Sequence, residues 1–133
     1  MTSSTHIITS TISLCAINVL SGHPFHPAPL AVAAFMSILP DIDSPQSHIG
    51  RWCKPFSGFL YRKIGHRTLT HSIFGWVMAG LLFLPLRFLP LDLYGAALIG
   101  YISHALIDLA NLEGVALTYP LLPHHRWVFP GDA

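Results

Sequence analysis

The chain has 133 residues, of which 52% are hydrophobic and only 10% are charged, and its formal net charge is +1. Average soluble proteins carry about 25% charged residues, so this composition predicts an integral membrane protein. A nearly neutral chain has no basic field with which to displace counterions, which excludes nucleic acid as an expected partner. The length suits a single domain over residues 1–133.

Histidine is unusually frequent for so apolar a chain. There are nine histidines against seven lysines and arginines, and histidine is the commonest metal ligand in proteins. Cys15 and Cys53 lie in unlike surroundings and form no CxxC pair, which speaks against a disulfide framework. Histidine and carboxylate side chains are therefore the candidates for chemistry.

Four apolar segments predict the main helices of an all-α integral-membrane bundle. They cover residues 3–21, 28–39, 72–84 and 93–111. Ser3 or Ser4 is available to cap the first helix, and the second must end where Leu39 precedes Pro40. The third is barely long enough, because a spanning helix needs about 20 apolar residues. With four helices, both chain termini are expected on the same side.

Two of these helices carry a polar stripe. His6, Ser10 and Ser13 share one face of the first helix. The stripe of the last helix consists of small and polar residues, namely Ala97, Gly100, His104, Asp108 and Asn111. Small residues allow another helix to approach closely, so the polar groups are expected to face protein rather than lipid.

Residues 51–63 interleave aromatic and basic side chains in a short amphipathic segment. The aromatic and apolar members are Trp52, Phe56, Phe59 and Leu60, and the basic ones are Arg51, Lys54, Arg62 and Lys63. This pattern predicts either a helix lying among lipid headgroups or an ordinary amphipathic surface helix. Under the positive-inside rule, the basic stretch 51–67 is expected on the cytoplasmic side. The Pro-rich tail after residue 113 is expected to be irregular.

His104 and Asp108 are four residues apart in the last helix, so their side chains lie one turn apart and can hold one cation. An ionisable pair inside an apolar helix is costly unless it has a partner. The alternative is a hydrogen-bonded pair that joins two helices.

Asp41 and Asp43 follow directly after an apolar helix, in the turn LPDIDSP. Negative charge at a helix C-terminus opposes the helix dipole, so a nearby cation would stabilise Asp41. Asp-x-Asp also presents two oxygen ligands on a short turn. The alternative is that Asp43 or Ser44 caps a new helix with Pro45 at its first position.

His66 and His71, in HRTLTHS, precede and open the third apolar helix, where Thr68 or Thr70 can act as the cap. Arg67 can bind phosphate or another anion through two nitrogens. Its alternative role is one more positive-inside charge.

The candidates form a mixed set of imidazoles and carboxylates. They are His6, Asp41, Asp43, His66, His71, His104 and Asp108. Such ligation fits zinc best, with manganese or iron as alternatives. Seven candidates exceed the four ligands of one zinc, so they indicate two metals, or one metal with carboxylates left over as base and supporting groups.

The other histidines lie in predicted loops and in the tail, and we expect them to be non-catalytic. They are His23, His26, His48, His124 and His125. A lone histidine such as His6 is also often just a satisfied polar residue, and this alternative stays open for it.

An ordered set of short motifs resembles the YdjM-like family, described as inner-membrane, metal-dependent hydrolases. The motifs are Thr5-His6, LPDIDSP (39–45), HRTLTHS (66–72), GYISHALIDLAN (100–111) and GVALTYPL (114–121). The resemblance covers nearly the whole chain and implies a metal role for all seven candidates. The ligand pattern of that family is in turn similar to zinc-dependent phospholipase C and the P1-type nucleases, which is an analogy of fold. Family members often continue with a further hydrophobic segment.

The predicted function is metal-dependent hydrolysis of an ester bond, in a phosphodiester or a phospholipid head group. Asp41 or Asp43 would act as the base, and Arg67 would stabilise the anionic substrate. One alternative is a membrane scaffold with a closed structural or vestigial metal site. Another is a metal or proton conduit, for which His104, near the middle of its predicted helix, is the main support. The expected partners are the lipid bilayer and a phosphate-containing substrate.

Overall fold

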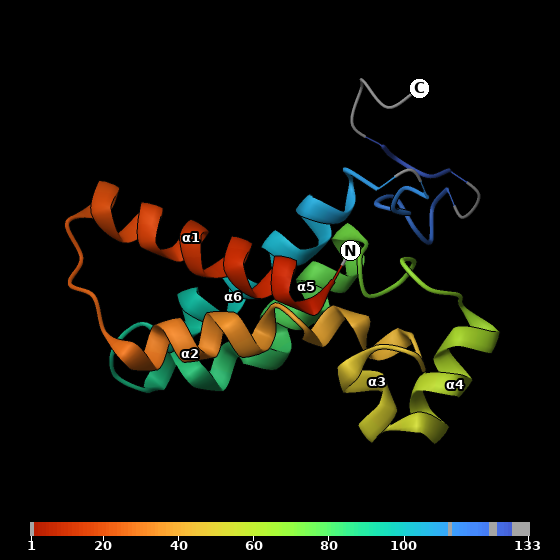
Figure 1. Ribbon diagram of the computed structural model, residues 1–133, viewed down its shortest axis with the longest axis horizontal. Coiled ribbons are helices and arrows are strands. Elements are labelled where there is room, and N and C mark those ends of the chain that lie inside the picture. Colours follow the sequence, from red (N-terminus) through yellow and green to blue (C-terminus); the bar gives the residue numbers. More distant parts are fainter. Residues whose placement is uncertain (1, 112, 123–124, 129–133) are drawn as a thin grey trace.

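The structure is a computed structural model that describes residues 2–111, 113–122 and 125–128. These residues form an all-α fold with one isolated antiparallel bridge, between Val115 and Trp127. The α-helices are α1 (Ser3–Ser21), α2 (Pro27–Met36), α3 (His48–Trp52), α4 (Lys54–Lys63), α5 (Ile73–Phe83) and α6 (Leu93–Asp108). Two short 3₁₀ helices, η1 (Leu39–Asp43) and η2 (Leu84–Phe88), extend α2 and α5 (Figure 1). The all-α class is therefore confirmed.

Helices α1, α2 and α6 pack against one another, and α5 packs on α6. The α2–α6 contact is very close at Gly100, where an added Cβ would lie 2.3 Å from the carbonyl oxygen of Ala33. The predicted stripe of small residues on the last helix is thus the surface against which α2 packs. Figure 1 shows α3 and α4 beyond one end of this helix group, near the N-terminal end of α1.

Several helix ends differ from the prediction because local capping groups decide them. Thr2, rather than Ser3 or Ser4, caps α1 through a hydrogen bond from the Thr5 amide. Ser72, rather than Thr68 or Thr70, caps α5. Helix α2 ends at Met36, before the Leu39–Pro40 pair, and the chain continues as η1. Helix α6 ends at Asp108, three residues earlier than predicted.

The buried face of α1 also differs slightly from the predicted stripe. Its buried residues are His6, Ser10, Leu14 and Asn18, a spacing of four throughout, whereas Ser13 is only half-buried. The polar stripe therefore continues along the helix instead of turning toward Ser13.

The basic segment forms two helices rather than one, because the chain turns at Cys53 between α3 and α4. Ser47 caps α3 by accepting the Gly50 amide at 2.9 Å, and its hydroxyl donates to the Asp41 carbonyl. The prediction that Asp43 or Ser44 caps a helix with Pro45 at its first position is thus wrong. The Asp43 carboxylate is used elsewhere, as described below.

Apolar side chains cover the outer surfaces of α1 and α5. Ile8, Ile12, Val19 and Leu20 are exposed on α1, and Val77, Leu81 and Leu82 on α5. Large exposed apolar surfaces mark contacts with lipid or another partner. Among the described helices, α1 alone is long and apolar enough to cross a membrane, and α5–η2 and α6 are shorter apolar helices. Four spanning helices therefore remain a proposal.

Candidate metal centre

The candidate ligands gather where four helical elements end. His6 comes from the first turn of α1, Asp41 and Asp43 from η1, and His104 and Asp108 from the last turns of α6. The loop between α4 and α5 supplies His66, Arg67 and His71. The start of α1, the end of α2, the start of α5 and the end of α6 thus meet, and Figure 1 shows α3 and α4 beside them.

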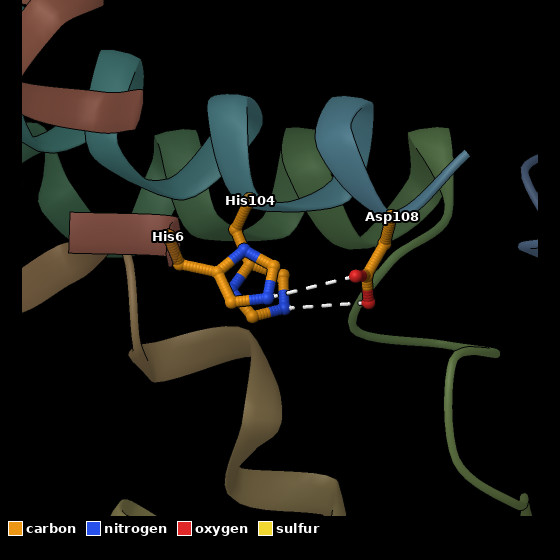
Figure 2. Close-up of side chains that lie close together, drawn as sticks. All are labelled: His6, His104 and Asp108. Carbon is orange, nitrogen blue, oxygen red and sulfur yellow. Dashed lines mark ion pairs between the residues drawn. The ribbon is translucent and has the colours of Figure 1, made fainter. Parts of the chain in front are cut away.

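The centre of the cluster is a stack of two imidazoles facing one carboxylate. The rings of His6 and His104 lie parallel, with centroids 3.6 Å apart. His6 Nε2 lies 3.5 Å from Asp108 Oδ1, and His104 Nε2 lies 3.7 Å from Asp108 Oδ2. Figure 2 shows both nitrogens directed at the two oxygens of Asp108. All three side chains are at most 1% exposed.

His71 and Asp41 complete this centre from the other side. His71 Nε2 lies 3.5 Å from Asp108 Oδ2, and Asp41 Oδ1 lies 3.4 Å from His104 Nε2. The His71 ring meets the His104 ring edge-on, with centroids 4.9 Å apart. Five of the seven candidates therefore converge: His6, Asp41, His71, His104 and Asp108.

Hydrogen bonds on the far side of two rings determine where their protons lie. His104 Nδ1 is 2.5 Å from the carbonyl oxygen of Ser37. Since a carbonyl only accepts, Nδ1 carries the proton and Nε2 of the neutral ring presents a lone pair. The hydroxyl of Thr70 donates to Asp43, so it accepts from His71 Nδ1 at 2.8 Å. The lone pair of His71 Nε2 consequently also faces Asp108.

These Nε2 atoms lack hydrogen-bond partners in the part of the chain that the structure describes. His71 and His104 each have a buried Nε2 without one, and His6 has neither ring nitrogen hydrogen-bonded, so its proton can lie on Nδ1 and leave Nε2 as a ligand. Lone pairs aimed at a carboxylate are unfavourable unless a cation or proton lies between them. Zinc bonds of about 2.0–2.1 Å in a tetrahedron put neighbouring ligand atoms roughly 3.3–3.4 Å apart. The observed separations of 3.4–3.7 Å fit a shared cation.

Asp43 and His66 form a different kind of contact. His66 Nδ1 lies 2.6 Å from Asp43 Oδ1, which is the length of a strong hydrogen bond and too short for two ligands of one ion. Asp43 Oδ2 also accepts from the Arg67 amide and the Thr70 hydroxyl. Asp43 is thus a hub that holds the loop between α4 and α5. It also lies near Asp41 and His66 in a third group with metal-ligand spacing.

Arg67 is bound to carboxylates rather than free to take up an anion. Its Nε donates to Asp108 Oδ2 at 2.8 Å and its Nη1 to Glu113 Oε2 at 2.7 Å. The backbone of Arg67 has a φ of 57°, an uncommon left-handed conformation for a non-glycine residue. Glu113 is 76% exposed, so a phosphate could displace it and leave the bond to Asp108 in place.

Burial and neighbouring charges shift the pKa values of His71 and Asp41. Burial lowers the pKa of His71 below its ordinary value, with the adjacent His104 acting in the same direction. Burial alone would raise the pKa of Asp41, but His104, His71 and His66 beside it bring the pKa below its ordinary value. His71 therefore favours its neutral, metal-binding form, and Asp41 its ionised form.

A polar pocket of about 350 Å³ leads to the cluster from the solvent side. Asp41, His66 and Arg67 line it together with Ser3 and His48. Asp41 is the candidate ligand with direct access to this pocket and the central imidazoles at once.

The histidines expected to be non-catalytic are not members of the central cluster where they are described. None of the groups with metal-ligand spacing found among the described residues contains His23, His26, His48 or His125. His48 and His125 are exposed. His124 lies outside the described residues.

Sequence reasoning missed the groups that hold the ligands. The Ser37 carbonyl has no sequence signal, because any residue offers one. Thr70 had a signal, its place beside His71, but we interpreted it as a cap. Glu113 lies beyond the predicted last helix, and its contact with Arg67 spans 46 residues.

Comparison with known proteins identifies the family of the chain. The model of the family "YdjM inner membrane protein" matches residues 1–131. The chain belongs to this family. It is 34% identical to the inner membrane protein YdjM of Escherichia coli (strain K12) over 112 residues, covering 81% of this chain and 54% of that protein. The YdjM protein of Shigella flexneri matches equally well.

A further relative of this YdjM family member is the uncharacterized protein YvsG of Bacillus subtilis (strain 168). It is 32% identical over 122 residues, covering 90% of this chain and 74% of that protein. The chain spans about half the length of the YdjM proteins it matches. No solved structure matches it. Family membership associates the chain with a bacterial inner membrane and its lipid bilayer.

Proposed function

We propose that this YdjM family member is a membrane-bound, metal-dependent hydrolase of a phosphate ester, acting as one domain. The observation that carries the proposal is the convergence of three buried Nε2 atoms, from His6, His71 and His104, on the carboxylates of Asp41 and Asp108. Arg67 already pairs with Asp108, and a further cation among these atoms would relieve the remaining contacts between lone pairs and carboxylates.

The donor set fits zinc, with manganese or iron as alternatives. His6, His104 and Asp108 would hold the ion, and His71 lies within reach as a fourth ligand. His104 belongs to both imidazole-rich groups, its Nε2 lies near both Asp41 and Asp108, and one lone pair binds one ion. We therefore propose one cation, with Asp43 and His66 as the hydrogen-bonded support of its ligands.

A bound divalent cation would supply the Lewis acidity that lowers the pKa of water and polarises the ester. Asp41, which lines the solvent pocket and favours its ionised form, accepts the proton of the attacking water. The water oxygen bonds to phosphorus, the ester P–O bond breaks, and the leaving alkoxide takes up a proton from solvent, while Asp41 releases to solvent the proton that it accepted. Arg67 orients Asp108 and presents its guanidinium toward the phosphate once Glu113 is displaced.

Metal analysis of detergent-purified protein tests the proposal. We expect the wild type to contain close to one zinc, manganese or iron ion per chain, and His104→Ala to lose it. His66→Ala should retain metal with weaker affinity, and His48→Ala, at the exposed pocket rim, should behave as wild type. A wild type that carries no metal and cannot be loaded would refute the proposal.

The structure also favours a second candidate, the scaffold with a structural ion. His6, His71, His104 and Asp108 are almost completely buried, as in closed four-ligand sites. Hydrolysis of a chromogenic phosphodiester separates the two functions. If the protein is a hydrolase, Asp41→Asn should abolish hydrolysis but still bind the metal. If it is a scaffold, neither the wild type nor the variant should hydrolyse the substrate.

The position of His104 no longer supports the alternative of a metal or proton conduit. His104 lies one turn before the end of α6, rather than at the middle of its helix. The other candidate ligands also lie at or near helix ends.

A further inference from the structure

An apolar groove runs along α5 beside the candidate metal centre. Its volume is about 450 Å³, within the range of ligand pockets. One wall is a row of residues four apart on α5, Phe74, Met78 and Leu82, and Phe56 of α4 faces it. Phe74 and Met78 are 48% and 49% exposed, so the groove is open along its length.

Thr70 joins this groove to the candidate metal centre. It lines the groove, while its hydroxyl donates to Asp43 and accepts from His71. Tyr101, another groove residue, donates its hydroxyl to the Thr70 carbonyl at 2.9 Å. The groove is otherwise lined almost entirely by apolar side chains, so its polar groups are confined to the end next to the metal ligands.

The groove is apolar and the pocket beside the candidate metal centre is polar, and this combination suits an amphiphilic ligand. The pocket lined by Asp41 and Arg67 is polar, whereas the groove, which other residues of η1 line, is apolar. Arg51 of α3 donates to the carbonyl oxygen of Gln46, which also lines the polar pocket. The chain belongs to an inner membrane family, so the molecule that offers an anionic head and a long apolar tail is a phospholipid.

We propose that the groove binds one acyl chain of a phospholipid, whose head group is the substrate of the metal centre. This inference rests on the proposed function for its catalytic part, but binding of the chain itself requires neither metal nor turnover. Bulk bilayer contact makes a different prediction, because lipid surrounding α5 would touch every exposed apolar side chain in proportion to its exposure.

Photo-crosslinking in metal-free vesicles tests the groove. The protein is reconstituted with phosphatidylethanolamine and a small fraction of phosphatidylglycerol that carries a diazirine at the end of one acyl chain. Labelled residues are then mapped by mass spectrometry. We expect severalfold enrichment on Phe74, Met78 and Leu82 over Val77 and Leu81, which are each 56% exposed outside the groove.

Two variants on α5 form a matched pair. Met78→Trp fills the groove and should abolish the enrichment on Phe74 and Leu82, whereas Val77→Trp, on the outer surface, should leave it unchanged. Labelling in proportion to exposure in the wild type would overturn the proposal, as would an enrichment that survives Met78→Trp. The wild-type map decides even when the variants do not fold.

The outcomes separate this inference from the proposed function. Enriched labelling of the groove in a protein that binds no metal would support the lipid site and refute the proposed hydrolase. Metal-dependent hydrolysis with labelling in proportion to exposure would support the hydrolase and refute the lipid site.

Discussion

At the scale of single residues, the site depends on groups that orient the ligands. Thr70 donates to Asp43 and so must accept from His71, which leaves the His71 Nε2 lone pair facing Asp108. The Ser37 carbonyl does the same for His104. Such groups commonly matter nearly as much to metal sites as the ligands themselves.

Replacing Thr70 tests this orientation. Thr70→Val keeps the shape but removes the hydroxyl, so His71 can turn its proton toward Asp108. We expect metal affinity to fall about 10–100-fold, the usual effect of losing such a partner. Competition with a chromogenic chelator measures it. Thr70→Ser should bind as wild type, and equal affinity of Thr70→Val would contradict the proton assignment.

The buried imidazole of His71 predicts a pH dependence of the metal-free protein. Its folded pKa is lower than the ordinary value of 6.5, so the unfolded chain takes up a proton at a pH where the folded chain does not. Stability is therefore full above about 6.5 and decreases as the pH falls below it. The slope is at most about 1.4 kcal/mol per pH unit for this group.

Melting curves in detergent and chelator between pH 8 and 5 measure this effect. His71→Asn should flatten the decrease, because asparagine does not titrate. A melting temperature that stays constant over this range in the wild type would show that His71 takes up its proton in the folded state as well.

At the scale of helices, contact between α2 and α6 positions the ligands. Gly100 lies against the backbone of Ala33, four residues before Ser37, whose carbonyl holds His104. A side chain at residue 100 would therefore separate the helices and release His104.

We expect Gly100→Ala to destabilise the protein by about 1–3 kcal/mol, the usual cost of overpacking, and to weaken metal binding. Thermal melting and metal titration check both effects. Gly58→Ala is the control, because an added Cβ there meets nothing within 4 Å. Equal effects of the two substitutions would argue against the close contact.

The basic helices α3 and α4 predict the orientation of the site. Under the positive-inside rule, we expect Arg51, Lys54, Arg62 and Lys63 to lie on the cytoplasmic side, together with the candidate metal centre. Cys53 is exposed between these helices and serves as a native probe. In a Cys15→Ser background, a membrane-impermeant maleimide should label Cys53 only after the cells are opened. Labelling of intact spheroplasts would reverse the orientation.

The helices themselves were largely predictable, whereas their ends were not. Apolar runs and Pro40 located α1, α2, α5 and α6 to within a few residues. The ends depend on which hydroxyl captures a free amide, and several serines and threonines compete for each. The split of the basic segment at Cys53 carries no clear signal in the sequence.

At the scale of the whole molecule, the sequence predicted the candidate ligands, but not which of them would bind the ion and which would support the others. Imidazoles and carboxylates in an apolar chain are conspicuous, and the family motifs named all seven. The stacking of His6 on His104, and the pairing of His66 with Asp43, arise from tertiary packing between distant segments. Sequence spacing therefore could not separate one ion with support from two ions.

The metal-to-protein ratio distinguishes one ion from two. Because His104 Nε2 is shared between the two imidazole-rich groups, we expect saturation at one equivalent of zinc. Titration of metal-free protein, with protein quantified by amino-acid analysis, measures it. Saturation at two equivalents would assign a second ion to Asp41, Asp43 and His66.

The stack of His6 on His104 has a consequence for biosynthesis. His6 leaves the ribosome almost at the start of translation, whereas His104 and Asp108 follow after nearly the whole described chain has been made. The cluster can close only when α1 and α6 have packed against each other. If the cluster holds the proposed ion, its uptake must follow synthesis of α6, and we expect a chain that stops before α6 not to retain it.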